Sequence, residues 1–588
     1  MRSIFVRFQP APHNLLQILH AVQACFGYLP EDALDALGEH LKMSRAQISS
    51  VAEFYAFFHL KPHGKYRVLF SNNITDRMQG SAVLRDELCH ALWVEQDKVS
   101  EDGLVSVGLT SCIGMSDQGP AMLVNGLPIT RLESARIDTI AERIRNRDPM
   151  ENWPHEWFRV DNKIYRRDWL LNTPLPPGAA LSTLLTRGED ASLIELKTSG
   201  LRGRGGAGFP TADKWSACRS ASGEAHYVVC NADEGEPGTF KDRVLLTDHA
   251  DLIFEGMTAC ARLIGAQRGF LYLRAEYRYL LDSLDAVLQR RRESNLLGTG
   301  ILGHARFDFD IEIHLGAGAY VCGEESALLE SLEGKRGIPR IRPPFPVQRG
   351  YLGQPTVVNN VETFAAAGKI MLEGSGTFSA LGTPQSRGTK LLSVSGDCAY
   401  PGLYEYPFGT SIRQILHDCG ASDTQAVQIG GAAGLCLSSH EFDRCLGYED
   451  APSAGAFMIF NRNRDMFEMA RNFAHFFAHE SCGFCTPCRV GTTLLRDLMD
   501  KIHAGRGSPT DLAQIEQIEA ILKNTSHCGL GQSAYHPISD TLTKFRSAYD
   551  TKLVHTNFSP AFDLDAALAT ARQMTGRDDI HAHLKEPT

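Results

Sequence analysis

Four of the 15 cysteines have a spacing that suits metal chemistry. Cys482, Cys485 and Cys488 follow a C-x-x-C-x-x-C pattern, so one tight loop can direct three thiolates at one centre, and Cys528 supplies a remote fourth. Three clustered soft ligands with a distant one fit a four-iron cluster best. A zinc site is the second interpretation, and four unrelated buried thiols are the third. Most of the other cysteines are scattered singly, as buried free thiols are.

A glycine-rich stretch at residues 199–211 could bind an anion. It contains five glycines, with Arg202 and Arg204 among them. Each glycine loses much backbone entropy on ordering, so such a run is tolerated mainly where the backbone passes very close to a flat or phosphorylated group. Bare N–H groups, a following helix N-terminus and guanidinium groups together make an anion cradle. The glycine pattern alone matches many surface loops, and it gains weight from the polar residues further along the chain.

Acidic and amide side chains come directly after residues 227–231, an apolar segment that predicts a strand. The next residues, 231–243, include the carboxyl groups of Asp233, Glu234, Glu236 and Asp242. Four such groups would repel one another on a featureless surface. Because open α/β sheets place their ligands at the C-terminal ends of strands, we predict a ligand site here.

The elements around these residues predict an α/β unit followed by helices. Strands at residues 270–273 and 307–314 alternate with helices at 252–263 and 277–293. The second of these strands leads through small residues and two carboxylates, residues 316–326, into a further helix.

The cysteines have helical elements of their own. A helix at residues 466–477 leads to the cysteine loop, and helices at 491–502 and 511–522 fold back to bring Cys528 to it.

Five blocks of this sequence resemble, nearly letter for letter, the NADH-oxidising flavoprotein subunit of respiratory complex I. The blocks are residues 200–211, 231–243, 316–326, 343–346 and 356–363. The resemblance covers residues 181 to about 533. It implies a Rossmann-like domain that binds FMN and NADH, and one 4Fe-4S cluster on the four cysteines described above.

The resemblance also implies which residues hold the flavin. They are Gly203, Arg204, Gly205, Gly206, Lys214, Asn231, Asp233, Glu234, Tyr320, Gly323, Glu324, Asn359, Asn360 and Thr363. A planar polar ring with a phosphate tail needs small residues for close approach, amides for its edge and N–H groups for the phosphate.

The NAD contacts that the resemblance implies are Phe209, Glu236, Glu325, Arg342 and Phe345. The two phenylalanines would stack on adenine, and Glu236 would lie toward the nicotinamide. Glu325 would accept a hydrogen bond from a ribose 2′-hydroxyl and repel a 2′-phosphate, which favours NAD over NADP.

Two positions depart from the family, and two are catalytic candidates. Arg342 stands where the family often has Lys, and Ala217 replaces one aromatic partner of adenine.

We take Glu234 and Glu236 as the catalytic candidates, although the hydride transfer itself needs no acid–base residue.

The first part of the chain predicts a helical bundle, residues 13–58, and a small α/β layer, residues 66–145. Together they resemble the thioredoxin-like iron–sulfur subunit of complex I, whose fold holds a two-iron cluster on four cysteines. Of these positions Cys112 remains. The other three are Ser71, Asp76 and Ser116. Because a two-iron centre normally needs four Cys ligands, or two with two His, we expect no 2Fe-2S cluster in this domain.

The predicted fold class is multidomain α/β. In chain order the predicted units are a helical bundle plus thioredoxin-like domain at 1–146, a linker at 147–180, the Rossmann-like FMN/NADH domain at 181–385, a ubiquitin-like β-grasp domain at 386–464, a C-terminal helical bundle with the iron–sulfur cluster at 465–549, and a tail at 550–588. The β-grasp domain shows no candidate chemistry, and we expect it to be a spacer.

The composition excludes other classes of function. The chain has 588 residues, enough for several domains, and a formal charge of −10, which argues against nucleic acid as a partner. No apolar run is long enough to span a bilayer. The N-terminus lacks the apolar core of a signal peptide, so we expect a cytoplasmic protein without direct membrane insertion.

The resemblance implies a diaphorase, which exchanges hydride between NAD(H) and FMN and single electrons between FMN and the 4Fe-4S cluster. Fusion of the thioredoxin-like and flavoprotein units resembles the diaphorase subunit of soluble NAD-reducing nickel–iron hydrogenases. That family implies a hetero-oligomer with a small iron–sulfur electron-transfer subunit and hydrogenase subunits. The alternatives are the flavoprotein subunit of an NAD-dependent formate dehydrogenase or of complex I, and a non-catalytic scaffold.

Overall fold

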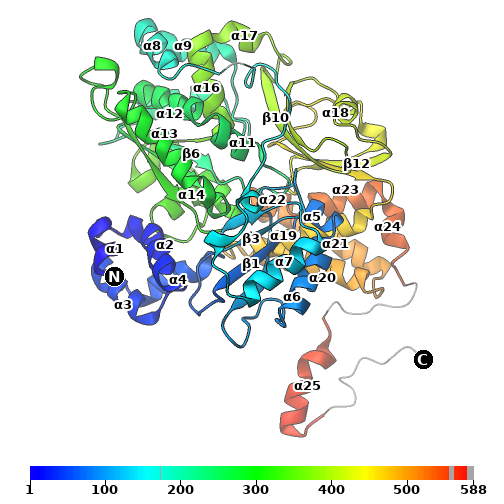
Figure 1. Cartoon of the computed structure of the whole chain (residues 1–588). Coiled ribbons are helices and arrows are strands. Elements are labelled where there is room, and N and C mark those ends of the chain that lie inside the picture. The colour runs from blue at the N-terminus through cyan, green and yellow to red at the C-terminus, as the bar shows by residue number, and fades with distance from the viewer. Residues whose placement is uncertain (173, 555–561, 579–588) are drawn as a thin grey trace.

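The computed structural model describes residues 1–172, 174–554 and 562–578. Within these residues the strands form three sheets, and helices pack against each of them (Figure 1). The predicted multidomain α/β architecture is confirmed. Of the expected tail, residues 555–561 and 579–588 lie outside the described part of the chain.

The chain begins with a small helical bundle. Its helices are α1 (Arg2–Arg7), α2 (Leu15–Phe26), α3 (Glu31–Leu41) and α4 (Arg45–Phe54). Leu15, Leu19 and Val22 recur on one side of α2 and are fully buried, as the helical spacing predicts. Ser44 begins α4 with a capping box to Gln47.

The thioredoxin-like unit is a four-stranded sheet in the order β2-β1-β3-β4. Its elements are β1 (Tyr66–Ser71), α5 (Ile74–Met78), α6 (Ser81–Ala91), β2 (Val105–Thr110), β3 (Met122–Val124), β4 (Leu127–Ile129) and α7 (Ser134–Arg145). Strands β3 and β4 pair as an antiparallel hairpin. Asn125 and Gly126 both have positive φ, 50° and 84°, as a two-residue hairpin turn requires.

The Rossmann-like unit has four parallel strands in the order β8-β7-β6-β9. They are β6 (Tyr227–Ala232), β7 (Arg268–Leu273), β8 (Asp310–Leu315) and β9 (Thr356–Asn360). The direction of winding reverses between β6 and β9, and at such a switch point a crevice opens at the carboxyl ends of the strands. Asn231 and Asn360 face each other across these two ends.

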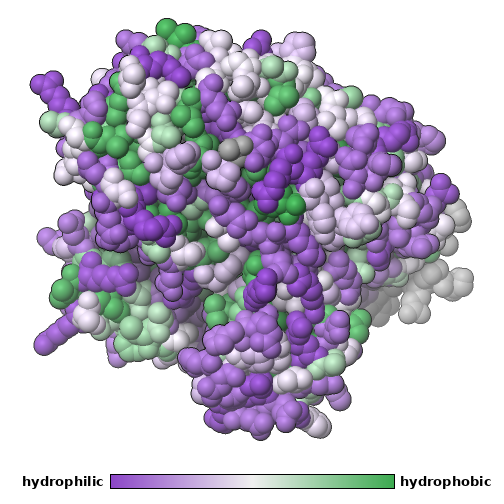
Figure 2. All heavy atoms as spheres, turned by 45° about the horizontal axis from the view of Figure 1, so that its top comes forward, coloured by the Kyte–Doolittle hydropathy of each residue, from purple (hydrophilic) through white to green (hydrophobic). Residues whose placement is uncertain are grey.

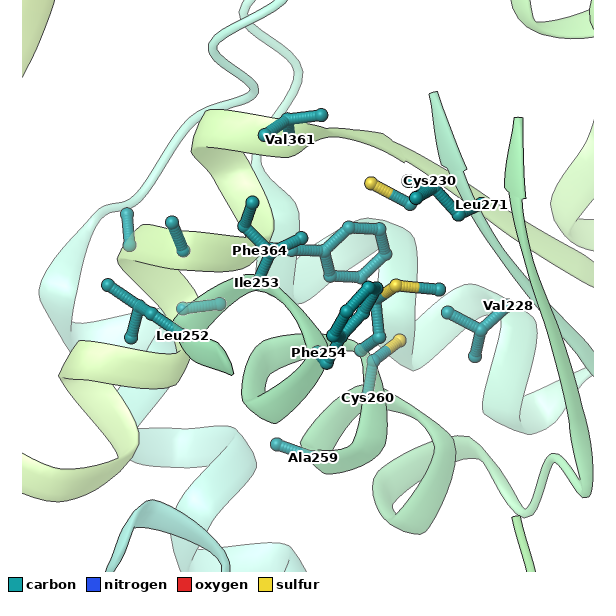
Figure 3. Close-up of a cluster of buried hydrophobic side chains, with 14 of the residues drawn as sticks. Val228, Cys230, Leu252, Ile253, Phe254, Ala259, Cys260, Leu271, Val361 and Phe364 are labelled. Carbon is teal, nitrogen blue, oxygen red and sulfur yellow. The ribbon is translucent and has the colours of Figure 1, made fainter. Parts of the chain in front are cut away.

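Helices surround this sheet. They are α8 (Ala179–Arg187), α9 (Glu189–Ser199), α10 (Thr211–Ser220), α11 (Lys241–Asp248), α12 (Ala250–Ile264), α13 (Leu281–Glu293), α14 (Glu325–Leu332), α15 (Pro346–Arg349), α16 (Val361–Glu373) and α17 (Ser375–Ser379). Figure 3 shows Phe254 and Phe364 pointing from α12 and α16 toward Val228, Cys230 and Leu271 on the strands. This cluster holds the sheet in place beneath the crevice.

A mixed sheet in the order β13-β12-β14-β10-β11-β5 forms the unit at the right of Figure 1. Its elements are β10 (Thr389–Gly396), β11 (Gly402–Pro407), α18 (Ile412–Asp418), β12 (Thr424–Ile429), β13 (Leu435–Ser438) and β14 (Ala456–Asn461). Strand β5 (Ile164–Arg166) comes from the segment expected to be a linker and pairs with β11. Glu405 of β11 accepts hydrogen bonds from the backbone N–H groups of Asp168 and Leu171, both at 2.9 Å, so this segment is tied to the sheet.

The C-terminal helices pack beside the thioredoxin-like unit. They are α19 (Met466–Glu480), α20 (Thr486–His503), α21 (Pro509–Thr525), α22 (Gly529–Ser533), α23 (His536–Lys544) and α24 (Arg546–Asp550), and α25 (Leu564–Thr575) follows in the tail. Helix α20 begins five residues earlier than the predicted helix at 491–502, so Cys488 lies in its first turn.

The surface is that of a protein with mixed polarity. Figure 2 shows hydrophilic side chains over most of the face in view, with apolar ones in small scattered groups. None of the helices in the described part of the chain is both long and apolar enough to cross a membrane.

Glycine at the contact between α12 and α16 yields a prediction for stability. A Cβ added to Gly256 would lie 1.9 Å from the backbone oxygen of Phe364, so Gly256→Ala must push the helices apart. We expect a loss of about 1–3 kcal/mol in unfolding free energy, measured as a lower midpoint of denaturant unfolding. In the control, Gly376→Ala, the new Cβ meets nothing within 4 Å. Equal midpoints for the two variants would contradict this account of the contact.

Candidate functional site

A cavity of about 470 Å³ lies at the carboxyl ends of β6 and β9. It brings together many of the predicted site residues, namely Gly205, Gly206, Asn231, Asp233, Glu234, Glu236, Tyr320, Gly323, Glu324 and Asn360. These residues come from the glycine loop, two strand ends and the start of α14. The fold therefore assembles at its switch point what the sequence holds in separate blocks.

The glycine loop folds back on itself and passes directly against Asn360. Gly203 N–H donates to the carbonyl oxygen of Phe209 at 2.9 Å. A Cβ added to Gly205 would lie 3.1 Å from Cβ of Asn360, and Gly206 has φ of +126°. Side chains at these two positions would fill the cavity wall or strain the loop. The loop therefore offers the backbone cradle that its sequence predicts.

Five of the predicted flavin residues do not line the cavity. They are Gly203, Arg204, Lys214, Asn359 and Thr363. Arg204 is buried, and its guanidinium donates to the carbonyl oxygens of Arg202 and Arg387 at 3.0 and 2.8 Å. Its backbone N–H donates to Oγ1 of Thr363 at 2.9 Å. In this structure Arg204 and Thr363 hold the loop from behind.

Lys214 and Asn359 support the site in a similar way. Lys214 Nζ lies 2.8 Å from Oε2 of Glu325 and 3.1 Å from the carbonyl oxygen of Val358. Oδ1 of Asn359 accepts from the indole N–H of Trp215 at 2.9 Å. The contact with Glu325 ties α10 to α14, and the other two tie α10 to β9.

Glu234 is a buried acceptor at the start of α11. Its carboxylate accepts from the N–H groups of Asp242 and Arg243 at 2.8 and 3.2 Å and from the hydroxyl of Tyr277 at 2.8 Å. Burial raises the pKa of Glu234 to about 7. These contacts fasten the acidic loop to the helix that comes after it.

Two other carboxyl groups face the cavity. Oδ2 of Asp233 is buried and has no hydrogen-bond partner among the described residues, and burial raises the pKa of Asp233 well above its ordinary value. Glu236 accepts from the hydroxyl of Tyr320 at 2.6 Å and from Ala433 N–H at 3.1 Å. Burial raises the pKa of Glu236 to about 7. Because buried polar atoms rarely stay unpaired, Asp233 indicates that the cavity receives a polar ligand.

Several lining residues were missed in the sequence. Gly235, Thr239 and Lys241 lie in the acidic block, and Val321 lies in the block at 316–326. The others come from the β-grasp unit and from α22 with its N-cap. The β-grasp contributions are Gly430, Ala433, Gly434, Pro452, Ser453 and Ala454. The expectation that this unit is a spacer is therefore wrong, because its loops form a wall of the cavity. The glycine pair directly after strand β12 was the available signal.

Among the predicted NAD residues, Glu236 lines the cavity and the others lie outside its lining. Arg342 forms ion pairs with Glu324 at 3.2 Å and Glu325 at 3.8 Å. Phe209 and Phe345 are 55% and 48% exposed. Aromatic rings left this open are free to stack on a ligand.

The four cysteines of the predicted cluster line one small cavity. Cys485 precedes the first residue of α20, and Cys528 precedes the first residue of α22. Among the described residues no three His, Cys, Asp or Glu side chains converge as a single metal ion requires. The four thiols surround one small cavity, and three clustered soft ligands with a remote fourth favour an iron–sulfur cluster over zinc.

The small cavity lined by the four cysteines shares a wall with the cavity of about 470 Å³ at the ends of β6 and β9, which is called the large cavity below. Val321, Cys528 and Leu530 line both of them. Burial raises the pKa of Cys528 to about 11 and that of Cys488 to about 12. Such thiols ionise at neutral pH only when a metal takes the place of the proton.

The thioredoxin-like unit brings its four predicted ligand positions close together. Ser71 Oγ donates to Oδ2 of Asp76 at 2.7 Å, and Sγ of Cys112 lies 3.9 Å from Oγ of Ser116. Asn73, which lies between Ser71 and Asp76 in the chain, donates its side-chain N–H to Ser116 Oγ at 2.9 Å. All four positions are buried. The donor set here is one thiol, two hydroxyls and one carboxyl group.

Three protein families match parts of this chain. Residues 1–145 match the thioredoxin-like [2Fe-2S] ferredoxin family, residues 196–369 the Nuo51 FMN-binding domain, and residues 468–552 the NADH-ubiquinone oxidoreductase-F iron–sulfur binding region. The second and third matches agree with the expected FMN and 4Fe-4S groups.

The first match corrects an expectation. It indicates a 2Fe-2S cluster in the N-terminal domain, so the expectation of no such cluster there is wrong. That expectation counted cysteine thiolates alone, whereas the match extends over the whole fold of a cluster-bearing ferredoxin. The structure keeps the four positions together, with oxygen-bearing side chains at three of them.

One curated relative and one solved structure match nearly the whole chain, and a second relative matches 63% of it. The alpha subunit of the NAD-reducing hydrogenase HoxS of Cupriavidus necator is 44% identical over 581 residues, which cover 96% of each chain. The HndC subunit of the NADP-reducing hydrogenase of Solidesulfovibrio fructosivorans is 41% identical, over 63% of this chain and 78% of its own. A chain from a crystal structure of NAD⁺-reducing [NiFe]-hydrogenase in the H₂-reduced state superimposes with a TM-score of 0.91 at 44% identity, covering 99% of this chain and 100% of its own.

The long alignments and the three family matches lead to one assignment. The chain belongs to the family of NAD-reducing hydrogenase alpha subunits, and it is a subunit of an NAD-dependent flavin and iron–sulfur oxidoreductase.

Proposed function

We propose that the large cavity binds FMN and receives NAD(H) as substrate, and that the four cysteines beside it hold a 4Fe-4S cluster. The single observation that carries this proposal is the wall that the two cavities share at Val321, Cys528 and Leu530. When bound, FMN exchanges a hydride with NAD(H) and single electrons with the cluster. A shared wall lets those electrons pass without a mobile carrier.

The residues of the cavity fit a flavin. Gly205 and Gly206 offer backbone without side chains, and Asn231 and Asn360 bring amides to the strand ends. The unpaired Oδ2 of Asp233 is an acceptor or donor for the polar edge of the ring. Arg204, Lys214, Asn359 and Thr363 act from behind by holding the loop, α10 and β9 in position.

The nicotinamide end of the substrate would lie toward Glu236. The hydroxyl of Tyr320 and the N–H of Ala433 hold this carboxyl group at the cavity. A carboxylate there stabilises the positive charge that a nicotinamide ring gains as it gives up a hydride. At the other end, Glu325 would accept from a 2′-hydroxyl and repel a 2′-phosphate, so the site favours NAD over NADP.

The proposed assembly is a cytoplasmic NAD-reducing hydrogenase, in which this chain binds a small iron–sulfur electron-transfer subunit and the hydrogenase subunits. The full-length relative from Cupriavidus necator, named as a hydrogenase subunit, supports this choice.

Reduction of an artificial dye by NADH tests the proposed activity. The purified chain, reconstituted with FMN and iron–sulfide, should reduce a dye such as ferricyanide with NADH much faster than with NADPH. Glu325→Ala should narrow the preference for NADH, because the 2′-phosphate then meets no carboxylate. Binding of FMN without any dye reduction by NADH would contradict the proposed activity.

Glu236 should give the reaction a pH dependence. Its pKa of about 7 means that the carboxylate form grows as pH rises from 6 to 8. We therefore expect kcat for NADH oxidation to rise across this range in the wild type. In Glu236→Gln it should be flat and about tenfold to hundredfold lower, a loss of about 1.4–3 kcal/mol. A Glu236→Gln profile that still rises through pH 7 would assign the titration to another group.

Removal of one cysteine ligand should abolish binding of the 4Fe-4S cluster without affecting binding of FMN. Cys485→Ser should remove about four irons per chain and leave FMN bound, since Cys485 lines only the small cavity of the two. The matched control is Cys398→Ser in the β-grasp unit, which should change neither count. The measurements are iron and sulfide analysis and flavin absorbance. Unchanged iron in Cys485→Ser would disprove the ligand assignment.

A further inference from the structure

A buried network of charges lies against the large cavity and is not used by the proposed function. Its centre is Lys241, the first residue of α11, whose side chain is 1% exposed. Nζ of Lys241 lies 2.6 Å from Oδ1 of Asp242, 3.1 Å from Oε2 of Glu362 and 3.2 Å from Oδ1 of Asn360. Lys241, Asp242 and Asn360 all line the cavity.

A second lysine binds the same carboxylate from the other side. Lys390 of β10 has a fully buried side chain, and its Nζ donates to Oε2 of Glu362. Oε1 of Glu362 accepts from Leu391 N–H at 3.0 Å. Arg204, whose guanidinium donates to backbone carbonyls, adds a third cation nearby. The network thus combines these cations with the carboxyl groups of Asp242 and Glu362, and the charge of Glu234 also acts on Lys241.

The two lysines differ in how firmly they hold their protons. Burial opposes the charge of Lys241, but Asp242 and Glu362 outweigh it and raise the pKa of Lys241 above its ordinary value. Burial, together with the cations Lys241 and Arg204, lowers the pKa of Lys390 to about 7 even though Glu362 opposes this. Lys241 is therefore the permanent cation of the network, and of the two lysines it is the one that lines the cavity.

A fixed cation at this position affects the energy of hydride transfer. A hydride carries two electrons and one proton, so whatever accepts it gains one negative charge. A positive charge that is fixed on a buried side chain beside the cavity stabilises that new charge more than it could in solvent. It does so without reorganising, because three side-chain oxygens hold Nζ of Lys241 in place.

We propose that Lys241 raises the reduction potential of the flavin in this cavity, and that Asp242, Glu362 and Lys390 set the size of the effect. This inference rests on the proposed FMN site. It assigns to Lys241 the role of favouring the reduced, negatively charged flavin over the oxidised one. Net charge, not side-chain volume, is then the property that matters at this position.

Redox titration of the flavin-loaded chain tests the proposal by the sign of the shift. Lys241→Met removes the cation and should lower the two-electron midpoint potential by about 30–60 mV, which corresponds to a tenfold to hundredfold weaker preference for the reduced flavin. Asp242→Asn removes a neighbouring negative charge and should raise the potential. If Lys241 had only a structural role, the midpoint potentials of both variants would shift in the same direction, since each variant breaks the hydrogen bond between Lys241 and Asp242.

Two further variants complete the test. Lys390→Met leaves Lys241 in place but exposes it to the uncompensated charge of Glu362, so the potential should fall. If Lys241→Met retains no flavin, the proposal is tested by Lys390→Met and Asp242→Asn, whose midpoint potentials should shift in opposite directions. The matched control is Lys335→Met, at a side chain that is 56% exposed and ion-paired with Glu333, and it should leave the potential unchanged.

The outcomes separate this inference from the proposed function. Unchanged potentials in flavin-loaded Lys241→Met and Asp242→Asn, or shifts of the same sign in Lys390→Met and Asp242→Asn, would overturn the role of Lys241 alone. A wild-type chain that binds no FMN on reconstitution would instead overturn the proposed flavin site, and with it the basis of this inference.

Discussion

Four carboxyl groups follow β6 within ten residues, and the need to bury them together shapes much of this structure. Like charges this close are stable only if each has its own donors or gives up its charge. Glu234 accepts hydrogen bonds from N–H groups in the first turn of α11. Glu236 accepts hydrogen bonds from the hydroxyl of Tyr320 and from an N–H group in a loop of the β-grasp unit. Asp242 forms an ion pair with Lys241 and accepts a hydrogen bond from the side chain of Asn360. Burial favours the neutral form of Asp233. One acidic loop thereby connects elements from two domains around a single cavity.

The same loop also positions the thioredoxin-like unit. Arg243 forms a fully buried, bidentate ion pair with Asp117, with N–O distances of 3.1 and 3.0 Å, and donates to the carbonyl oxygen of Gly114 at 2.7 Å. Arg274 donates both to the carbonyl oxygen of Glu234 and to that of Cys112. Breaking a buried pair of this kind typically costs about 3–5 kcal/mol. The N-terminal domain is therefore held rigidly against the loop that forms the large cavity.

Local sequence was sufficient for the parts of the site in which one segment supplies both the backbone path and the ligand groups. Asn231 lies at the end of β6, Asp233 and Glu236 follow it, and strand ends define the crevice of a parallel sheet. The direction of Arg204 could not be predicted, because a glycine loop can turn its neighbours either way. In the structure this guanidinium points away from the cavity, onto carbonyl groups and the ring of Phe408, 4.8 Å from its centroid.

Contributions from remote segments were the hardest to predict. The β-grasp loops that line the cavity carry small residues such as Gly434 and Ala454, which bear no chemical group that a motif could reveal. Strand β5 lies in a proline-rich region, and only its pairing with β11 shows that it is part of a sheet. The error over the 2Fe-2S cluster has a different cause, since a count of thiols does not measure how much of a domain's fold has been kept.

The path of the chain through its last helices explains why two kinds of electron chemistry can meet in this protein. Helices α20 and α21 run out and back, so Cys528 returns to the loop that holds Cys482 and Cys485. On its other side the same residue borders the large cavity, together with Val321 and Leu530. A wall one residue thick keeps the two cavities distinct, so each can hold its own group. Val321 lies in a short 3-10 helix, Cys528 comes directly before α22 and Leu530 lies in it. Since these residues border both cavities, the stabilisation of a reduced group on one side can set the driving force for electron transfer to the other.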